Sequence, residues 1–482
     1  MTAKTTSRLN GCHMAYYRLK DNYLLRGWKK LPYAVLDKKT RRVGFVDGER
    51  FAAIQYCCGT ISEECASFIP AYKDTAEELL KAGVVEKLDS PKPLNKEQEY
   101  IEYPSRFVHT ALWSITGKCN YKCKHCYMSA PCAKYGEISH ENCLRIIDQL
   151  AECGVQSISL TGGECLVRKD FFELVDRLVS RGVQISQIYS NGWLVNEKLL
   201  DSLAERGIHP EFNMSFDGVG QHDWIRGIDG AEEAVIRAFK LCKEKGFPTD
   251  AEFCMHKKNA HTLRESVNLL ASLGCRSLKV SPVMATGEWE KNNFGEYTMS
   301  MKEAYDVWLE YIPHYYEDKK PLEIMLSGLF SSSPKRAAYV IPAQKCKVDK
   351  DASNFCMCGH ARNNLYITAE GRMAPCMPLS GNDALLQKLP NLCETNLADA
   401  LDDSYYMDLV NARLSAYLER NKRCAGCEWR NACLAGCRGC AMQDTGDYFG
   451  VDKGACLLFK GGYRDKVIEV VKRVAPDEEF IG

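Results

Sequence analysis

Cysteine is the residue type that most constrains how this chain can fold. The 482-residue sequence contains 25 cysteines, many of them in two groups with short spacings, at residues 119–126 and 346–456. The N-terminal segment MTAKTTSRLN has no apolar stretch after its charged residues, so we expect no export and a cytoplasmic location. Because the cytoplasm keeps thiols reduced, disulfides are a poor explanation for so many cysteines. Metal ligation or redox chemistry explains the two groups better.

Charge and hydropathy argue against two classes of partner. Lys plus Arg and Asp plus Glu both number 63. No overall positive field therefore favours nucleic acid or an anionic membrane. No stretch approaches the ~18 consecutive apolar residues that a membrane-spanning helix needs. We expect neither a nucleic acid nor a membrane as partner.

Residues 1–88 are predicted to form a small α+β domain, and residues 89–106 a linker. The linker is polar and punctuated by prolines, which is typical of a connecting segment. Within the small domain we expect two short strands, a helical segment, and a helix that ends at Gly83 and runs into a strand. These lie at 33–37, 42–47, 49–59 and 75–88.

From residue 107 the pattern changes to a regular alternation of strands and amphipathic helices. Such alternation predicts parallel βα units, and six of them are enough for an open, partial barrel but not for the usual eight-stranded one. We therefore predict an α/β fold with a partial (β/α)6 TIM-like barrel over 107–310. The expected strands are 109–116, 157–163, 185–192, 210–218, 248–256 and 277–284.

Beyond the barrel, regular patterning fades. Residues 311–345 are predicted to be a mostly helical bridge, and 346–460 a cysteine-rich domain with little apolar periodicity. A domain of that kind needs covalent or metal staples, which its cysteines can supply. Residues 461–482 are expected to form a closing helix.

The first cysteine group follows the first barrel strand and contains Cys119, Cys123 and Cys126. A zinc site that uses His125 as fourth ligand is one interpretation. Structural zinc usually takes two ligands from each of two separated segments, so three from one tight loop fit it poorly. A [4Fe-4S] cluster fits better, because three thiolates can bind three irons and leave the fourth iron open.

The spacing C-x3-C-x2-C followed by an aromatic residue resembles the signature of the radical S-adenosylmethionine (SAM) superfamily. Further motifs in the expected order strengthen the resemblance: a Gly-Gly-Glu after the second strand, Ser-Asn-Gly after the third, and Ser-Phe-Asp-Gly after the fourth. Each polar residue alone could equally be a helix cap. Arg226 is a candidate partner for the SAM carboxylate, with Arg237 as a competitor. The cofactor-binding residues that the resemblance implies are Tyr127, Gly162, Gly163, Glu164, Ser190, Asn191, Ser215, Asp217 and Arg226.

The resemblance also implies a reaction. The cluster would bind SAM through its amine and carboxylate and donate an electron to it. Cleavage of the sulfonium bond would then give a 5′-deoxyadenosyl radical that abstracts hydrogen from an unactivated position. The cofactor would carry this difficult step, while the protein positions it. The sequence identifies no catalytic base.

The C-terminal cysteines are similar to the seven-cysteine SPASM extension of this superfamily, which holds two auxiliary iron–sulfur clusters. A zinc ribbon is the alternative, but seven spaced cysteines exceed one four-ligand site. By the family's pattern one cluster would take Cys424, Cys427, Cys433 and Cys456. The other would take Cys358, Cys376 and Cys437, with Cys346 or Cys356 as the fourth ligand or with one iron left open. Cys393 and Cys440 appear as extra cysteines.

The layout of residues 1–88 resembles the winged-helix-like peptide-recognition domain of enzymes that modify ribosomally made peptides. Such domains bind a leader peptide as an added strand. The implied partners are a precursor peptide with a leader sequence and a reductant such as flavodoxin or ferredoxin. A structural cap or an interaction domain is the alternative role.

The predicted function is therefore a radical SAM/SPASM maturase of a ribosomally synthesised peptide. A thioether or another side-chain cross-link is the favoured product, and an epimerised residue is also open. One alternative is an anaerobic sulfatase maturase, but that group carries Asp where this chain has Met377. Another is a non-catalytic iron–sulfur electron carrier, which would have no use for the Gly-Glu and Ser-Phe-Asp-Gly motifs.

Overall fold

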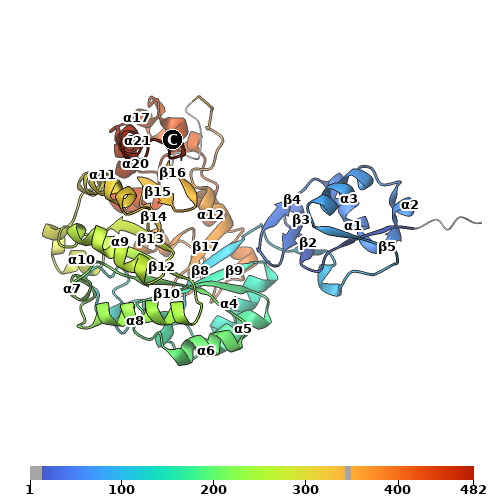
Figure 1. Cartoon of the computed structure of the whole chain (residues 1–482), viewed down its shortest axis with the longest axis horizontal. Helices are drawn as coiled ribbons and strands as arrows, with labels where there is room; N and C mark the ends of the chain where they lie inside the picture. Colours follow the sequence, from blue (N-terminus) through green and yellow to red (C-terminus); the bar gives the residue numbers. More distant parts are fainter. Residues whose placement is uncertain (1–13, 342–348, 482) are drawn as a thin grey trace, which may run out of the picture. The chain divides into compact units, whose positions relative to one another are not determined.

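The computed structural model describes residues 14–341 and 349–481. The chain divides into two compact units (Figure 1). The first contains the described residues up to Phe107, together with Glu152–Gly154, and the second contains the remainder. Cys346 lies outside the described residues.

The N-terminal unit is built from two small sheets and three helices. One sheet has the order β5-β1-β6 and the other β4-β3-β2-β7. Helix α1 begins after Asp47, whose side chain accepts the N–H of Arg50, and this cap satisfies one of the free donors of the first turn. The elements are β1 (Tyr16–Leu19), β2 (Tyr23–Trp28), β3 (Leu31–Asp37), β4 (Val43–Phe45), α1 (Gly48–Tyr56), β5 (Cys58–Ser62), α2 (Glu63–Ala66), α3 (Tyr72–Lys81), β6 (Val85–Leu88) and β7 (Ile101–Tyr103).

The core of this unit lies between α1, α3 and the strands. Helix α3 buries Tyr72, Ala76 and Leu79, which recur at the spacing of one helix face. They pack in one cluster with residues of β1 and α1, among them Leu19 and Phe51. The strands and helices expected between residues 33 and 88 are thus present at nearly the expected positions.

The segment expected as a linker is instead part of the N-terminal unit. Strand β7 pairs in parallel with β2, and a 3-10 turn, η1 (Lys96–Gln98), precedes it. Gln98 is buried, and its amide donates to the backbone oxygens of Leu19, Lys20 and Tyr23 at 3.0–3.3 Å. Polar composition suggested a free connection, but these polar groups bind backbone that would otherwise lack partners.

The second unit contains the predicted partial barrel. Six neighbouring parallel strands, β8 to β13, are separated by helices that cover the outer face (Figure 1). All six expected strands are confirmed. They are β8 (Thr110–Ser114), β9 (Ser157–Thr161), β10 (Gln184–Ser190), β11 (Glu211–Ser215), β12 (Thr249–Met255) and β13 (Ser277–Pro282), and the helices between them include α4 (His140–Glu152), α5 (Phe171–Ser180), α6 (Glu197–Glu205), α7 (His222–Arg226), α8 (Ala231–Glu244) and α9 (Leu263–Ser272).

The sheet continues past both ends of the barrel. Strand β14 pairs in parallel with β13, and β15 and β16 follow as antiparallel strands. The prediction of a mostly helical bridge was therefore wrong after α11, because short strands with few residues give no clear periodicity. These elements are α11 (Met301–Glu317), β14 (Glu323–Leu326), β15 (Phe330–Ser333) and β16 (Arg336–Val340).

The cysteine-rich segment contributes two strands to the other edge of the same sheet. Strand β17 (Asn364–Ile367) pairs in parallel with β8, and β18 (Met373–Ala374) pairs with β17. The closing helix is present as α21 (Tyr463–Val474), followed by β19 (Phe480–Ile481) beside β16. The segment also contains short helices: α12 (Gly359–Asn363), which precedes β17, and then η6 (Met377–Gly381), α13 (Asp383–Leu386), α14 (Leu397–Ala400), α15 (Ser404–Val410), α16 (Leu414–Arg420), α17 (Lys422–Ala425), α18 (Arg430–Cys433), α19 (Arg438–Thr445) and α20 (Lys453–Phe459).

No helix within these two described ranges is both long and apolar enough to cross a membrane.

Candidate functional site

The three-cysteine loop follows β8 and carries half-buried thiols. Backbone N–H groups of Tyr121 and Ala130 donate to the sulfurs of Cys119 and Cys126 at 3.4 and 3.3 Å. A guanidinium nitrogen of Arg226 lies 3.7 Å from the sulfur of the remaining cysteine, Cys123. Donors directed at sulfur stabilise the thiolate form, which is the form that binds iron.

Glycines from three barrel connections hold this loop closely. A methyl group at Gly163 would lie 2.3 Å from the backbone oxygen of Lys118, and one at Gly227 would lie 2.3 Å from that of Lys122. A methyl group at Gly287 would lie 2.5 Å from a third carbonyl oxygen of the loop. Gly227 and Gly287 also have positive φ angles of 67° and 59°. These positions therefore require glycine, both for space and, at two of them, for backbone conformation.

Glu164 is buried where β9 ends, and its carboxylate accepts hydrogen bonds from residues at the end of the next strand, β10. Its carboxylate accepts the hydroxyl of Ser190 at 3.1 Å and the backbone N–H of Asn191 at 2.7 Å. The N–H of Leu166 donates to it at 3.2 Å. Burial raises the pKa of Glu164 to about 6, although these hydrogen bonds oppose the rise. A buried carboxylate of this kind can bind an ammonium group.

Asp217 and Arg226 form a buried ion pair in the connection that follows β11. The Arg226 Nε lies 2.6 Å from Asp217 Oδ2, and the other carboxylate oxygen accepts the N–H of Cys254 at 2.8 Å. Burial alone would raise the pKa of Asp217, but Arg226 and His222 outweigh it and hold the pKa well below its ordinary value. Arg226 is therefore already paired to a protein carboxylate on its Nε side.

The remaining predicted contact residues lie around the same strand ends. The Asn191 amide is 2.8 Å from Asn120 Oδ1 in the cysteine loop. Ser215 ends β11 and is half-buried. Burial raises the pKa of Tyr127 well above its usual value, and the nearby Tyr366 of β17 adds to the rise. The structure thus brings the motif after β9 together with that after β10, and places both next to the loop.

The zinc interpretation of the first group gains no support. Burial and the positive charge of Arg226 lower the pKa of His125 to about 3, so its imidazole is neutral and the geometry of the possible ligands decides the question. Within the described part of the chain, no three His, Cys, Asp or Glu side chains converge on a single ion. Thiolates on a cubane cluster bind different irons, so they need not converge in that way.

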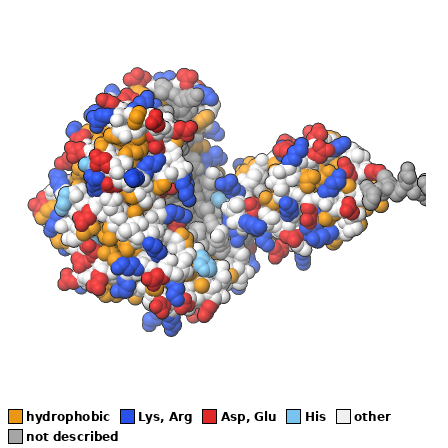
Figure 2. All heavy atoms as spheres, in the orientation of Figure 1, with side chains coloured by type: hydrophobic (Ala, Val, Ile, Leu, Met, Phe, Trp, Pro, Cys, Tyr) orange, Lys and Arg blue, Asp and Glu red, His pale blue; other side chains and the backbone are white. Residues whose placement is uncertain are grey.

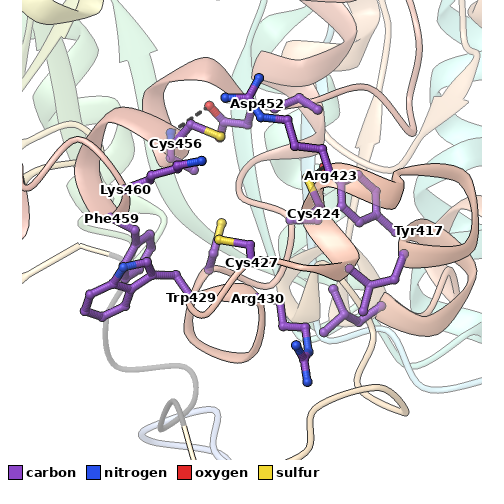
Figure 3. A pocket seen from close by; sticks show the side chains of 16 residues that line it. Tyr417, Arg423, Cys424, Cys427, Trp429, Arg430, Asp452, Cys456, Phe459 and Lys460 are labelled. Carbon is purple, nitrogen blue, oxygen red and sulfur yellow. Dashed lines mark hydrogen bonds between the residues drawn. The ribbon is translucent and has the colours of Figure 1, made fainter.

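Four C-terminal cysteines surround one cavity of about 60 Å³. The side chains of Cys424, Cys427 and Cys456 point toward the same space (Figure 3). Cys433 lines the cavity as well, and Asp452 stands at its edge. Four thiols around a small space are the ligand set that a cubane cluster requires.

The other predicted group is only partly assembled among the described residues. The sulfur of Cys376 interacts electrostatically with those of Cys437 and Cys358. Cys356 instead directs its sulfur to the backbone oxygen of Asn411 at 3.8 Å. The cysteines of this group that the structure describes are not in disulfides, so their thiols remain available for iron.

Two charged residues on β12 and β13 were not anticipated from the sequence. Lys279 Nζ lies 3.2 Å from Glu252 Oε1, and the negative charge of Glu252 raises the pKa of Lys279. Lys279 also interacts with Cys254, near the Asp217 ion pair, and with Cys437 of the C-terminal group. The pair therefore lies between the two cysteine regions. The alternation of polar with apolar residues along both strands could have suggested it.

A comparison with known families gives the barrel its identity. The sequence pattern of the family described as "Radical SAM superfamily" matches residues 113–270, from β8 into α9. Residues 113–270 thus form a radical SAM domain. Such a domain holds a [4Fe-4S] cluster on three cysteines. The cluster and SAM, when both are bound, supply the 5′-deoxyadenosyl radical. The residues of this domain fit both the cluster and SAM. Amide donors face the loop sulfurs that would bind the cluster, and Glu164 offers a buried carboxylate to the SAM ammonium.

Curated relatives are similar to about three quarters of the chain. A PqqA peptide cyclase of Granulibacter bethesdensis is 26% identical over 368 residues, which cover 76% of this chain and 92% of the relative. An AdoMet-dependent heme synthase of Methanosarcina barkeri is 24% identical over 358 residues, which cover 70% of this chain and 93% of the relative.

A solved structure shares the fold over a larger part of the chain. Streptococcus suis SuiB, bound to its precursor peptide SuiA, matches with a TM-score of 0.66 and 15% identity. The match covers 91% of this chain and 99% of SuiB. The N-terminal unit makes up more than a fifth of the chain, so this coverage must include much of it.

Proposed function

We propose that this chain is a radical SAM enzyme that modifies a ribosomally synthesised precursor peptide, with a thioether or another side-chain cross-link as the product. The observation that carries the proposal is the fold likeness to a precursor-peptide complex over 91% of the chain. The similarity to a peptide cyclase over 368 residues points the same way. The heme synthase matches a smaller share of the chain, 70%, than the peptide cyclase, which matches 76%.

The N-terminal unit offers a place for a leader peptide. Strand β4 is an edge of its sheet, and a groove of about 740 Å³ runs beside it. An edge strand presents unpaired backbone groups that an extended peptide can pair with. Val35 and Ile54 give the groove apolar walls, while Arg42 and Asp47 contribute opposite charges. We assign leader recognition to this groove.

Charge distribution supports a peptide rather than a nucleic acid as partner. Lys and Arg side chains are mixed with Asp and Glu over the face of each unit drawn in Figure 2. This agrees with the equal totals of 63 positive and 63 negative residues. Nucleic-acid binding requires a concentrated positive surface.

The proposed cofactors also imply roles for individual residues, an electron donor and a cellular location. Glu164 would hold the SAM ammonium, with Ser190 and Asn191 orienting its carboxylate. Cleavage of SAM needs an external electron, for which a flavodoxin or ferredoxin is the proposed source. Thiols that must remain free to bind iron favour a cytoplasmic location.

The groove can be tested by filling it. Gly44 lines the groove, and a side chain there would meet only the backbone oxygen of Val35, at 3.9 Å. Gly44→Trp should therefore fold and block the groove. The probe is the peptide encoded by a short reading frame beside this chain's own gene. Its affinity for the full-length chain should fall at least about tenfold, or ~1.4 kcal/mol.

Gly295→Trp is the matched control, because Gly295 also has open space around it but lies in the barrel unit. It should bind the peptide like the unmodified chain, and both variants should bind SAM normally. Equal peptide affinity for Gly44→Trp and the unmodified chain would contradict the assignment of the groove. Formylglycine formation in a sulfatase peptide would instead favour the sulfatase-maturase alternative.

A further inference from the structure

The C-terminal region contains a C-x2-C pair of which only the first cysteine is a predicted cluster ligand. Cys437 is a predicted auxiliary ligand, and Cys440 follows it after Arg438 and Gly439. The first iron–sulfur loop and the four-cysteine cavity each contain a pair with the same spacing. The side chains of Cys437 and Cys440 are both exposed, so neither is a buried structural cysteine.

The two thiols belong to the same helical turn. Cys437 precedes helix α19, and Cys440 lies in its first turn. The charges of the two side chains influence each other. Asp452 fixes the start of this helix, since its Oδ2 accepts the N–H of Cys437 at 2.7 Å. Whatever binds the Cys437 sulfur therefore lies within reach of the Cys440 sulfur.

Packing places this helical turn against the segment that carries Cys376. A methyl group at Gly439 would lie 2.6 Å from Cβ of Pro378, two residues after Cys376. Gln443, one turn later, donates to the backbone oxygen of Pro378 at 3.2 Å. The sulfur of Cys376 interacts with those of Cys358 and Cys437. The Cys437–Cys440 pair is thus held next to the two other thiols of the incomplete group.

Cys356 is the other candidate for the fourth ligand that the structure describes, and its sulfur points to a different partner. Cys356 donates to the backbone oxygen of Asn411, and its own backbone bridges to Arg413. The second rival, Cys346, lies outside the described residues.

We propose that Cys440 is the fourth ligand of the auxiliary cluster held by Cys358, Cys376 and Cys437. This inference rests on the assignment of an auxiliary cluster to those three cysteines. On binding, the Cys440 thiol releases its proton to solvent and its sulfur bonds to the iron that would otherwise be open. Every iron of that cluster then has a protein ligand. The cluster transfers electrons, and a substrate thiolate does not bind to it.

The test uses the full-length chain, reconstituted anaerobically with iron and sulfide. Three measurements are compared: iron per chain, the rate at which a chelator removes iron, and the EPR spectrum of the reduced clusters. None of them depends on substrate. The variants are Cys440→Ala, Cys440→Ser, the rival Cys356→Ala, the matched control Cys393→Ala and the cluster control Cys376→Ala.

The unmodified chain should hold ~12 irons, four in each of three clusters. In Cys440→Ala, about a third of that iron should be lost at least tenfold faster than from the unmodified chain, since even outer-shell changes weaken metal sites about 10–100-fold. Cys440→Ser, which can still ligate through oxygen, should keep the cluster but shift its EPR signal. Cys393→Ala should behave like the unmodified chain.

Two results would overturn the proposal, and they are distinguishable. If Cys376→Ala loses iron while Cys440→Ala matches the unmodified chain, the cluster exists but another residue completes it. Loss in Cys356→Ala would identify that residue. If Cys376→Ala also keeps all its iron, the auxiliary cluster itself is absent from this group.

Discussion

Glu164 shows how one residue's surroundings define its chemistry. It is buried, and donors from β10 and from its own loop surround its carboxylate. Burial raises its pKa from an ordinary 4.5 to about 6. In the SAM-free protein the unfolded state therefore loses this proton first, and stability falls as the pH rises from 4.5 to 6. A bound ammonium group would compensate the buried negative charge.

Replacing Glu164 with Gln tests this role. SAM affinity of the unmodified chain should weaken as the pH falls below about 6, because the carboxyl group becomes neutral and no longer attracts the ammonium. Glu164→Gln should bind SAM at least about tenfold more weakly at pH 7.5, equivalent to ~1.4 kcal/mol, and lose this pH dependence. Equilibrium dialysis with labelled SAM measures both. An unchanged pH profile in the variant would contradict the role.

The sequence predicts residues that belong to a motif better than residues that meet across strands. Cys119 and Glu164 stand in recognisable local patterns, and the structure places them close to each other. The Glu252–Lys279 pair depends on how β12 and β13 pair. Alternation along each strand indicates which face a side chain takes, but not which residue of the neighbouring strand lies beside it.

At the scale of elements, β7 and the turn before it contribute to the N-terminal unit. Composition suggested a linker here, because short polar segments carry no hydrophobic period. The buried side chain of Gln98 reverses that expectation, since it donates to three backbone oxygens of the β1–β2 region. The same limitation explains why β14 to β16 were not predicted. The long βα repeats, in contrast, have clear periodicity and were predicted correctly.

Gln98→Ala should destabilise the N-terminal unit by about 1–3 kcal/mol, because buried backbone acceptors would lose their donor. Native-state hydrogen exchange at the amides of β1 and β2 measures the loss. Lys96→Ala in the same turn is the control, since Lys96 is exposed and should change stability by less than about 0.5 kcal/mol. Equal protection in the two variants would show that the turn does not hold the unit together.

At the scale of the whole molecule, one continuous sheet links the radical SAM loop to the C-terminal cysteines. The cysteine-rich segment adds β17 beside β8, while the last strand, β19, pairs with β16 at the opposite edge. Both cysteine regions therefore belong to a single compact unit.

The most direct test of the account is the formation of 5′-deoxyadenosine from SAM by the reduced, reconstituted full-length chain, with the peptide product followed by mass spectrometry. The unmodified chain should cleave SAM and modify the precursor peptide. Cys123→Ala should abolish both, because the cluster that binds SAM is lost. Cys427→Ala should retain some cleavage but yield no modified peptide. Equal 5′-deoxyadenosine formation by Cys123→Ala and the unmodified chain would contradict the central claim.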